Sequence, residues 1–91
     1  MITAKRYYIT GRVQGVSFRF FTLRSSCTLG ITGFVRNLND GRVEILAQGN
    51  RTALESFYDS IKKGPPAARV DHIEIVEEQP DSKYKDFQIT Y

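Results

Sequence analysis

The chain has 91 residues, 41% of them hydrophobic, and a formal net charge of +3. This length predicts one domain over residues 1–91 with a small core, and the hydrophobic content argues against a disordered chain. The single cysteine, Cys27, excludes an intramolecular disulfide and fits a reducing cytoplasm, and no hydrophobic run approaches the ~20 residues that span a bilayer.

The first 30 residues predict a strand followed by a helix. Hydrophobic and polar residues alternate over residues 5–13, which is the period of a strand with one face on the core. A helix is expected over residues 18–29, and Gly30 can adopt the left-handed conformation that ends many helices. Residues 25–28 are small or polar and favour a helix only weakly, so packing has to stabilise it. The residues expected on the core face of the strand are Tyr7, Ile9 and Val13.

Residues 32–48 predict a hairpin. Strands are expected over residues 32–38 and 42–48, with Asn39, Asp40 and Gly41 between them. These residue types favour tight turns, and glycine can take the positive φ that such turns need. Because the connection is so short, the two strands should be antiparallel neighbours.

The most clearly predicted helix follows residue 50. Its apolar residues recur at the spacing of one helical face: Leu54, Phe57, Tyr58 and Ile61. The start of the helix is open, because either Asn50 or Thr52 can cap it, Thr52 together with Glu55 in a capping box. Gly64 and the two prolines after it end the helix.

Two further strands are expected, over residues 70–77 and at the end of the chain over 87–91. Val70 and Ile73 break the two-residue period, which predicts a bulge or a late start near His72. The order strand, helix, strand, strand, helix, strand is that of two split βαβ units. The predicted fold class is therefore α+β. It is a ferredoxin-like sandwich whose antiparallel sheet of four to five strands carries both helices on one face.

The stretch from Gly11 to Arg19, GRVQGVSFR, joins the first strand to the first helix. A glycine turn before a helix gathers free backbone N–H groups at the positive helix end, which suits an anion. Arg19 lies in the first helical turn, where its guanidinium can hold a phosphate with two parallel hydrogen bonds. The stretch lacks the Gly-Lys-Ser/Thr ending of a P-loop and the three-glycine spacing of a dinucleotide site.

This stretch closely resembles the signature of the acylphosphatase family, and so does GFVRNLNDGRV over residues 33–43. Residues 64–70 and 87–91 are also similar to that family, so the resemblance covers nearly the whole chain. It implies a hydrolase that cleaves the carboxyl–phosphate bond of acyl phosphates to a carboxylate and inorganic phosphate. It implies neither a metal nor an organic cofactor, which agrees with a single histidine and a single cysteine that supply no metal-ligand cluster.

The resemblance also implies roles for individual residues. The family's essential arginine corresponds to Arg19, and its catalytic asparagine corresponds to Asn37. The backbone amides of the loop are expected to hold the phosphate oxygens. The loop consists of Gln14, Gly15, Val16, Ser17, Phe18 and Arg19. An amide such as that of Asn37 can orient a water but cannot act as a base at neutral pH, so the substrate's own phosphate is expected to take the proton. Many relatives have glycine where Ser17 stands, which predicts a local change in the loop.

Two other classes of function stay open when the residues are considered alone. RNA-recognition domains share the strand and helix order, but they place stacking aromatics on their two central strands. Residues 42–48 contain no aromatic, and Tyr8 is the only obvious candidate on the first strand. A non-catalytic regulatory domain would not require Arg19 and Asn37 together in their motifs. The expected partners are a small acyl phosphate and inorganic phosphate as product and inhibitor. No nucleic acid and no membrane are expected, and the chain is expected to be a monomer.

Overall fold

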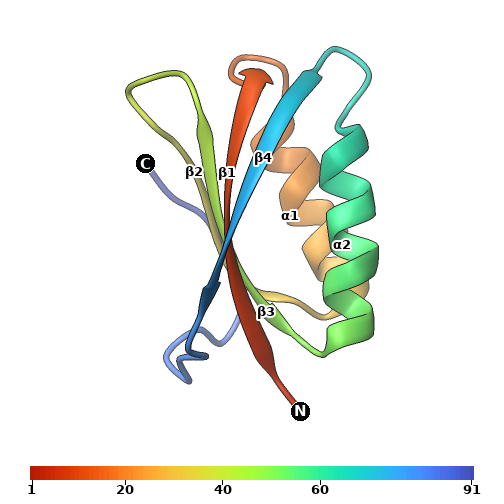
Figure 1. The fold of residues 1–91 in the computed structure, drawn as a ribbon, viewed down its shortest axis with the longest axis vertical. Coiled ribbons are helices and arrows are strands. Elements are labelled where there is room, and N and C mark those ends of the chain that lie inside the picture. Colours follow the sequence, from red (N-terminus) through yellow and green to blue (C-terminus); the bar gives the residue numbers. More distant parts are fainter.

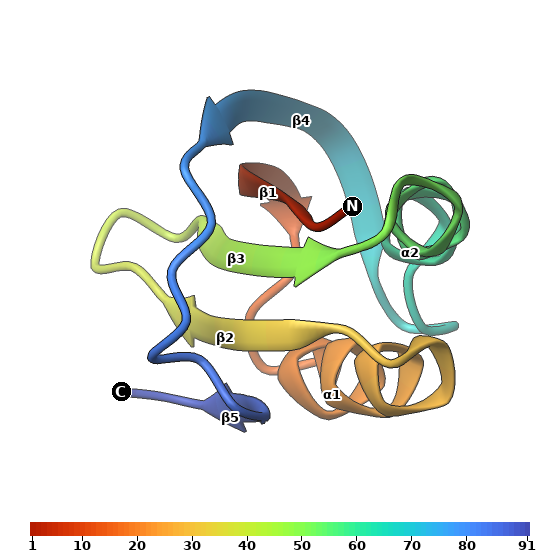
Figure 2. The same ribbon diagram turned by 90° about the horizontal axis from the view of Figure 1, so that it is seen from below.

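The computed structural model describes all 91 residues, which form a five-stranded sheet and two helices. In chain order the elements are β1 (Thr3–Arg12), α1 (Phe18–Leu29), β2 (Thr32–Asn37), β3 (Val43–Gly49), α2 (Arg51–Lys63), β4 (Arg69–Glu78) and β5 (Phe87–Ile89). Both helices cover the same face of the sheet (Figures 1 and 2), and the strand order is β4-β1-β3-β2-β5. The predicted ferredoxin-like α+β fold is thus confirmed. No helix is both long enough and apolar enough to cross a membrane.

The sheet is antiparallel in its first four strands and parallel in its last pair. β1 pairs antiparallel with β3 and β4, and β2 pairs antiparallel with β3, whereas β5 runs parallel to β2. The chain leaves β4 at one edge, and residues 79–86 cross past β3 and β2 to the other edge (Figure 2). The last strand therefore enters beside β2 in the same direction, and the sheet is mixed where an antiparallel one was predicted.

Local hydrogen bonds explain where the elements begin and end. α1 ends as predicted at Gly30, which has φ 69°, and the amide of Ile31 donates to the carbonyl oxygen of Ser26. The start of α2, left open by the sequence, is capped by Asn50, whose Oδ1 accepts from the amide of Ala53 at 2.7 Å. A left-handed glycine satisfies the last carbonyls of a helix, and an Asn cap satisfies one of its first amides.

The predicted bulge in β4 is also present. Thr10 pairs with His72 and Gly11 pairs with Val70, so Asp71 has no residue opposite it on β1. Gly11 has φ 137°, and a Cβ atom there would lie 2.1 Å from the carbonyl oxygen of Arg69. Only glycine fits this close approach of the two strands.

The hydrophobic core lies between the sheet and the two helices. Its largest fully buried side chains include Tyr7, Ile9, Val13, Phe18, Phe57 and Ile61. α1 packs through small residues, because Thr22 and Ser26 are buried and their hydroxyls donate to the carbonyl oxygens of Phe18 and Leu23 within the helix. These bonds satisfy the hydroxyls without an outside partner, so a weakly amphipathic helix can still lie close to the core.

An ion-pair network covers the other face of the sheet. The carboxylate of Glu44 on β3 is buried, and it accepts from Arg6 Nη1 at 2.6 Å and from Arg36 Nε. Burial alone would raise the pKa of the Glu44 carboxyl, but its hydrogen bonds and charge contacts with Arg36 and Arg6 outweigh burial and hold this pKa below its usual value. The carboxylate therefore stays ionised in the folded chain and joins β3 to both of its neighbours.

We expect stability to fall in acid partly because of Glu44. A folded-state pKa below the unfolded one contributes stability that is complete above the unfolded pKa, about 4.3, and is lost as pH falls through the folded one. Glu44→Gln should lower the free energy of unfolding at pH 7 by about 1–3 kcal/mol and flatten its dependence on pH below about 5. Urea unfolding from pH 3 to 7 measures both, and Glu74→Gln, an exposed carboxylate without an ion pair, is the control. An unchanged slope for Glu44→Gln would contradict this account.

Candidate functional site

Two loops meet at one end of the sheet. Residues 13–17 connect β1 to α1, and residues 38–42 connect β2 to β3. Both β1 and β2 are antiparallel to β3, which lies between them, so they are parallel to each other and end on the same side. The β1–α1 loop and the β2–β3 turn accordingly stand together at the upper end of the sheet in Figure 1.

A cavity of about 270 Å³ lies at this end of the molecule. It contains both residues that the motifs single out, Arg19 from the start of α1 and Asn37 from the end of β2. The full lining is Val13, Gly15, Ser17, Phe18, Arg19, Phe20 and Asn37. None of these is a carboxylate or a histidine, so the cavity has an arginine as its only ionisable side chain.

The backbone of the loop presents free amides. Gly15 and Ser17 have φ of 73° and 66°, and they flank Val16, whose φ is negative. No backbone amide of residues 14–20 donates a hydrogen bond within the protein, and Ser17 caps α1 without a side-chain hydrogen bond. Left-handed residues alternating with others turn successive N–H groups toward a common concave side, and the N-terminus of a helix adds its positive dipole end. Such an arrangement suits the oxygens of an anion.

Ser17 is the only residue other than glycine with positive φ. An L-residue in this region costs about 1–2 kcal/mol, whereas glycine adopts it freely and loses only about 0.5–1 kcal/mol of backbone entropy. Ser17→Gly is therefore expected to raise the free energy of unfolding by about 0.5–1 kcal/mol without moving the loop. The comparison is Ser25→Gly inside α1, which should lower it by about 0.5–1 kcal/mol. Equal destabilisation of the two variants in urea would show that Ser17 is not strained.

Arg19 is a half-buried cation without a counter-ion. Its guanidinium forms no salt bridge and no hydrogen bond with the protein, and it lies 5.0 Å from the centre of the Tyr91 ring. Arg6 and Arg36, by contrast, are both paired with Glu44. The positive charge of Arg19 is thus available at the cavity. Its contact with the Tyr91 ring does not use the N–H donors of the guanidinium, which remain free.

Asn37 contributes an acceptor that the protein does not satisfy. Its Oδ1 is the one buried side-chain polar atom that has no hydrogen-bond partner. A buried acceptor without a partner is costly, so such atoms usually bond to water or to a ligand. Asn37 precedes the tight turn at Asn39, Asp40 and Gly41. Asn37 nevertheless lines the cavity, and its Oδ1 accepts no hydrogen bond from the turn.

Most of the predicted loop lines the cavity, but two residues do not. Gln14 extends its side chain to the β2–β3 turn, where Nε2 donates to the carbonyl oxygens of Leu38 and Arg42. Val16 packs against the hydrophobic core. Two lining residues, Val13 and Phe20, were not among the predicted ones. Phe20 is 69% exposed. Its position directly after Arg19 is the only feature of the sequence that could have indicated a place at the cavity.

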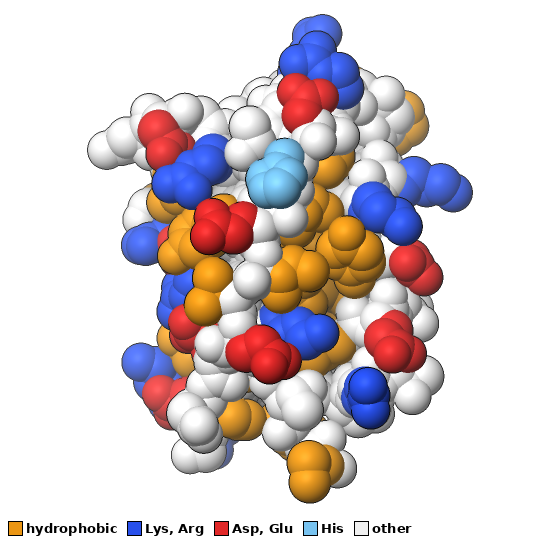
Figure 3. All heavy atoms as spheres, in the orientation of Figure 1, with side chains coloured by type: hydrophobic (Ala, Val, Ile, Leu, Met, Phe, Trp, Pro, Cys, Tyr) orange, Lys and Arg blue, Asp and Glu red, His pale blue; other side chains and the backbone are white.

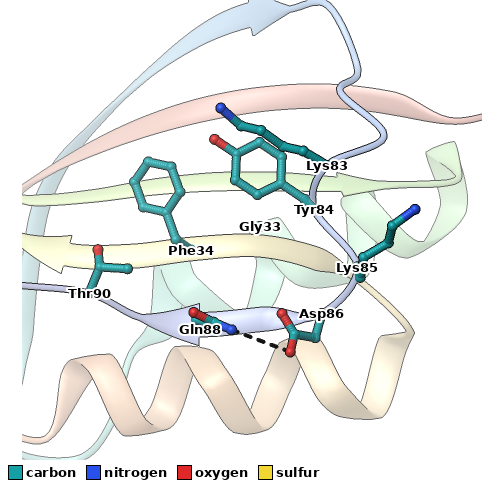
Figure 4. A pocket seen from close by; sticks show the side chains of 8 residues that line it. All are labelled: Gly33, Phe34, Lys83, Tyr84, Lys85, Asp86, Gln88 and Thr90. Atoms are coloured by element: carbon teal, nitrogen blue, oxygen red, sulfur yellow. Dashed lines mark hydrogen bonds between the residues drawn. The ribbon is translucent and has the colours of Figure 1, made fainter.

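A second hollow, of about 340 Å³, lies beside β2 and β5 (Figure 4). The rings of Phe34 and Tyr84 stand 6.0 Å apart in it, and the lysines on its rim are exposed. It shares no residue with the first cavity and has no buried polar atom in need of a partner.

Charges elsewhere do not form a second site. On the face drawn in Figure 3, basic and acidic side chains are interspersed. No group of three or more His, Cys, Asp or Glu side chains is placed to hold a metal ion. The free amides, the unpaired guanidinium and the unsatisfied amide oxygen therefore make the cavity at Arg19 the best candidate site.

Comparisons with known proteins agree on one family. A family model described as Acylphosphatase matches residues 5–89. An acylphosphatase of Koribacter versatilis is 49% identical over 93% of this chain and 77% of its own length, and one of Archaeoglobus fulgidus is 43% identical over 97% and 98%. The crystal structure of acylphosphatase from Bacillus subtilis superposes with a TM-score of 0.94 at 40% identity and covers all of both chains.

Proposed function

The chain belongs to the acylphosphatase family, and from this membership we propose a role for each residue of the site. The reaction is the hydrolysis of an acyl phosphate to a carboxylate and inorganic phosphate. Arg19 and the backbone amides of residues 14–19 hold the phosphate, and Asn37 orients the attacking water. Residues 1–91 act as one acylphosphatase-like domain.

The free donors around the cavity are the observation that carries this proposal. A phosphoryl group brings three oxygens, which need several donors at once. The guanidinium of Arg19 offers a fork of N–H groups with no competing carboxylate, and the amides of residues 14–20 have no partner within the protein. Donors that are already oriented stabilise the charge that grows on these oxygens in the transition state.

Asn37 acts on the other reactant. Its buried Oδ1 accepts a hydrogen bond from the water and so directs a lone pair of the water oxygen toward phosphorus. A bond forms between this oxygen and phosphorus, the bond from phosphorus to the carboxyl oxygen breaks, and the carboxylate leaves with the electron pair. A proton of the water passes to a phosphate oxygen of the substrate, because the cavity is lined by no side chain that is a base at neutral pH.

The test is phosphate release from a simple aromatic acyl phosphate by the purified chain. We expect turnover that is the same with and without excess chelator, and competitive inhibition by inorganic phosphate, which occupies the same donors. Activity that disappears with the chelator and returns with a divalent ion would overturn the metal-free mechanism. No release under either condition would overturn the proposed function.

The remaining parts of the proposal concern partners and location. The chain acts as a monomer in the cytoplasm on small acyl phosphates, without nucleic acid. The absence of aromatics from the central strand β3 supports the exclusion of nucleic acid, since an RNA-recognition surface needs them there. Retention on single-stranded RNA at physiological salt would contradict it, and light scattering measures the mass in solution.

A further inference from the structure

The side chain of Gln14 is a bridge between the two halves of the site. Its Nε2 donates to the carbonyl oxygen of Leu38 at 2.7 Å and to that of Arg42 at 2.9 Å. An amide nitrogen carries two hydrogens, so both are used. The residue that begins the phosphate loop thus holds the two ends of the turn that follows Asn37.

This bridge has no substitute in the structure. The regular pairing of β1 with β3 ends at Ile9 and Val43. Beyond that point no other hydrogen bond joins residues 13–17 to residues 38–42. Gln14 is therefore the only hydrogen-bonded link between the loop that leads to Arg19 and the turn that follows Asn37.

The bridge is not needed to satisfy the turn. The carbonyl oxygen of Arg42 also accepts from the amide of Leu38 at 2.8 Å, and the carbonyl oxygen of Leu38 also accepts from the amide of Gly41 at 3.2 Å. Each carbonyl keeps a backbone partner when Gln14 is removed, so no buried acceptor is left alone. The two bonds from Gln14 therefore link the loop to a turn that is already hydrogen-bonded within itself.

We infer that Gln14 is a positioning residue that sets the place of Asn37 relative to the bound phosphate, an inference that rests on the proposed function. The water must stand in line with the bond that breaks, and a displacement of about 1 Å can lower a rate about a hundredfold. Gln14 affects the rate through Asn37 and contributes little through its side chain to phosphate binding, which the loop amides and Arg19 perform.

The first measurement separates rate from binding. Gln14→Met keeps the length of the side chain and removes the donor. We expect kcat to fall about ten- to a hundredfold, while the inhibition constant of inorganic phosphate changes by less than about threefold. Gln79→Met, an exposed glutamine without a hydrogen bond, is the matched control and should behave as wild type. An unchanged kcat for Gln14→Met would overturn the inference, and so would an equal loss of kcat and phosphate affinity.

A double variant tests whether the effect passes through Asn37. In the Asn37→Ala background, Gln14→Met should lower turnover no further, because the group that it positions is gone. Losses that multiply would show an independent role and would overturn the inference. Amide exchange at Gly41, expected to be faster in Gln14→Met, needs no activity. If the wild-type chain releases no phosphate, the proposed function fails. The exchange rate at Gly41 then tests by itself whether Gln14 holds the turn in place. Faster exchange supports it and unchanged exchange overturns it.

Discussion

Replacement of Arg19 by lysine should lower turnover nearly as far as its replacement by alanine. Lysine keeps the charge, but it is a single point donor and loses the planar fork that makes two parallel hydrogen bonds to a phosphate. The loss of one well-placed donor typically costs about 3–4 kcal/mol of transition-state stabilisation, which is roughly a hundred- to a thousandfold in rate. Phosphate affinity should fall as well, because in the proposed site the same donors hold product and substrate.

The measurement is kcat and the phosphate inhibition constant for Arg19→Lys and Arg19→Ala. Arg24→Lys, on the same helix but exposed, controls for the change of residue type. Arg19 makes no ion pair in the protein, so thermal stability should hold or rise in both variants. A lysine variant with near-normal turnover would contradict bidentate binding, and a lowered melting temperature would indicate a structural role instead.

Loss of Asn37 should abolish most turnover and leave phosphate binding intact. If the side chain holds only the water, Asn37→Ala removes an interaction that matters mainly in the transition state, so kcat and kcat/KM should fall together by roughly a hundredfold or more. KM and the inhibition constant of phosphate should stay nearly constant. A fall in phosphate affinity by about the same factor as turnover would place Asn37 among the phosphate ligands instead.

Two companion variants sharpen the Asn37 experiment. Asn37→Asp is almost isosteric, but its negative charge should repel the phosphate and remove the donor, so both turnover and phosphate affinity should fall. Asn39→Ala, exposed in the turn two residues on, should alter activity little. The contrast between neighbouring asparagines separates the effect of the water from a loosening of the hairpin.

The parts of the fold that depend on neighbours in sequence could be predicted. Gly30 ends α1 where a left-handed residue was expected, and the bulge of β4 lies beside His72. The start of α2 could not be resolved, because Asn50 and Thr52 both suit a cap and only the hydrogen bond from Ala53 distinguishes them. Local chemistry thus narrowed this helix start to two residues.

Features that depend on long-range packing could not be predicted from the sequence pattern. The direction of β5 follows from the path of residues 79–86 across the sheet, and no residue type encodes that path. Glu44 and Gln48 alternate with core residues and would be expected to face solvent. Both are buried, because two arginines flank Glu44 and the backbone of Asp81 bonds to the Gln48 amide.

In the candidate site, too, locally encoded features could be predicted and long-range contacts could not. Arg19 and the turn at Gly15 could be identified from a strand-to-helix junction alone, but Asn37 looked like an ordinary turn residue without the family resemblance. The side chain of Gln14 was expected to matter less than its backbone. Its contact with Leu38 and Arg42 joins segments more than twenty positions apart, which no local pattern can reveal.

The short strand β5 covers an edge of the sheet that β2 would otherwise leave open. Through the pairs from Gly33 with Phe87 to Val35 with Ile89 it occupies the hydrogen-bonding edge of β2, and Phe87 anchors it in the core against Phe57. An uncovered edge beside hydrophobic residues is a template for pairing with another molecule. At the opposite edge, β4 exposes charged side chains, which discourage such pairing, and Ile75 and Val76 are exposed among them. The β2 edge of the sheet is therefore closed by a strand of only 3 residues.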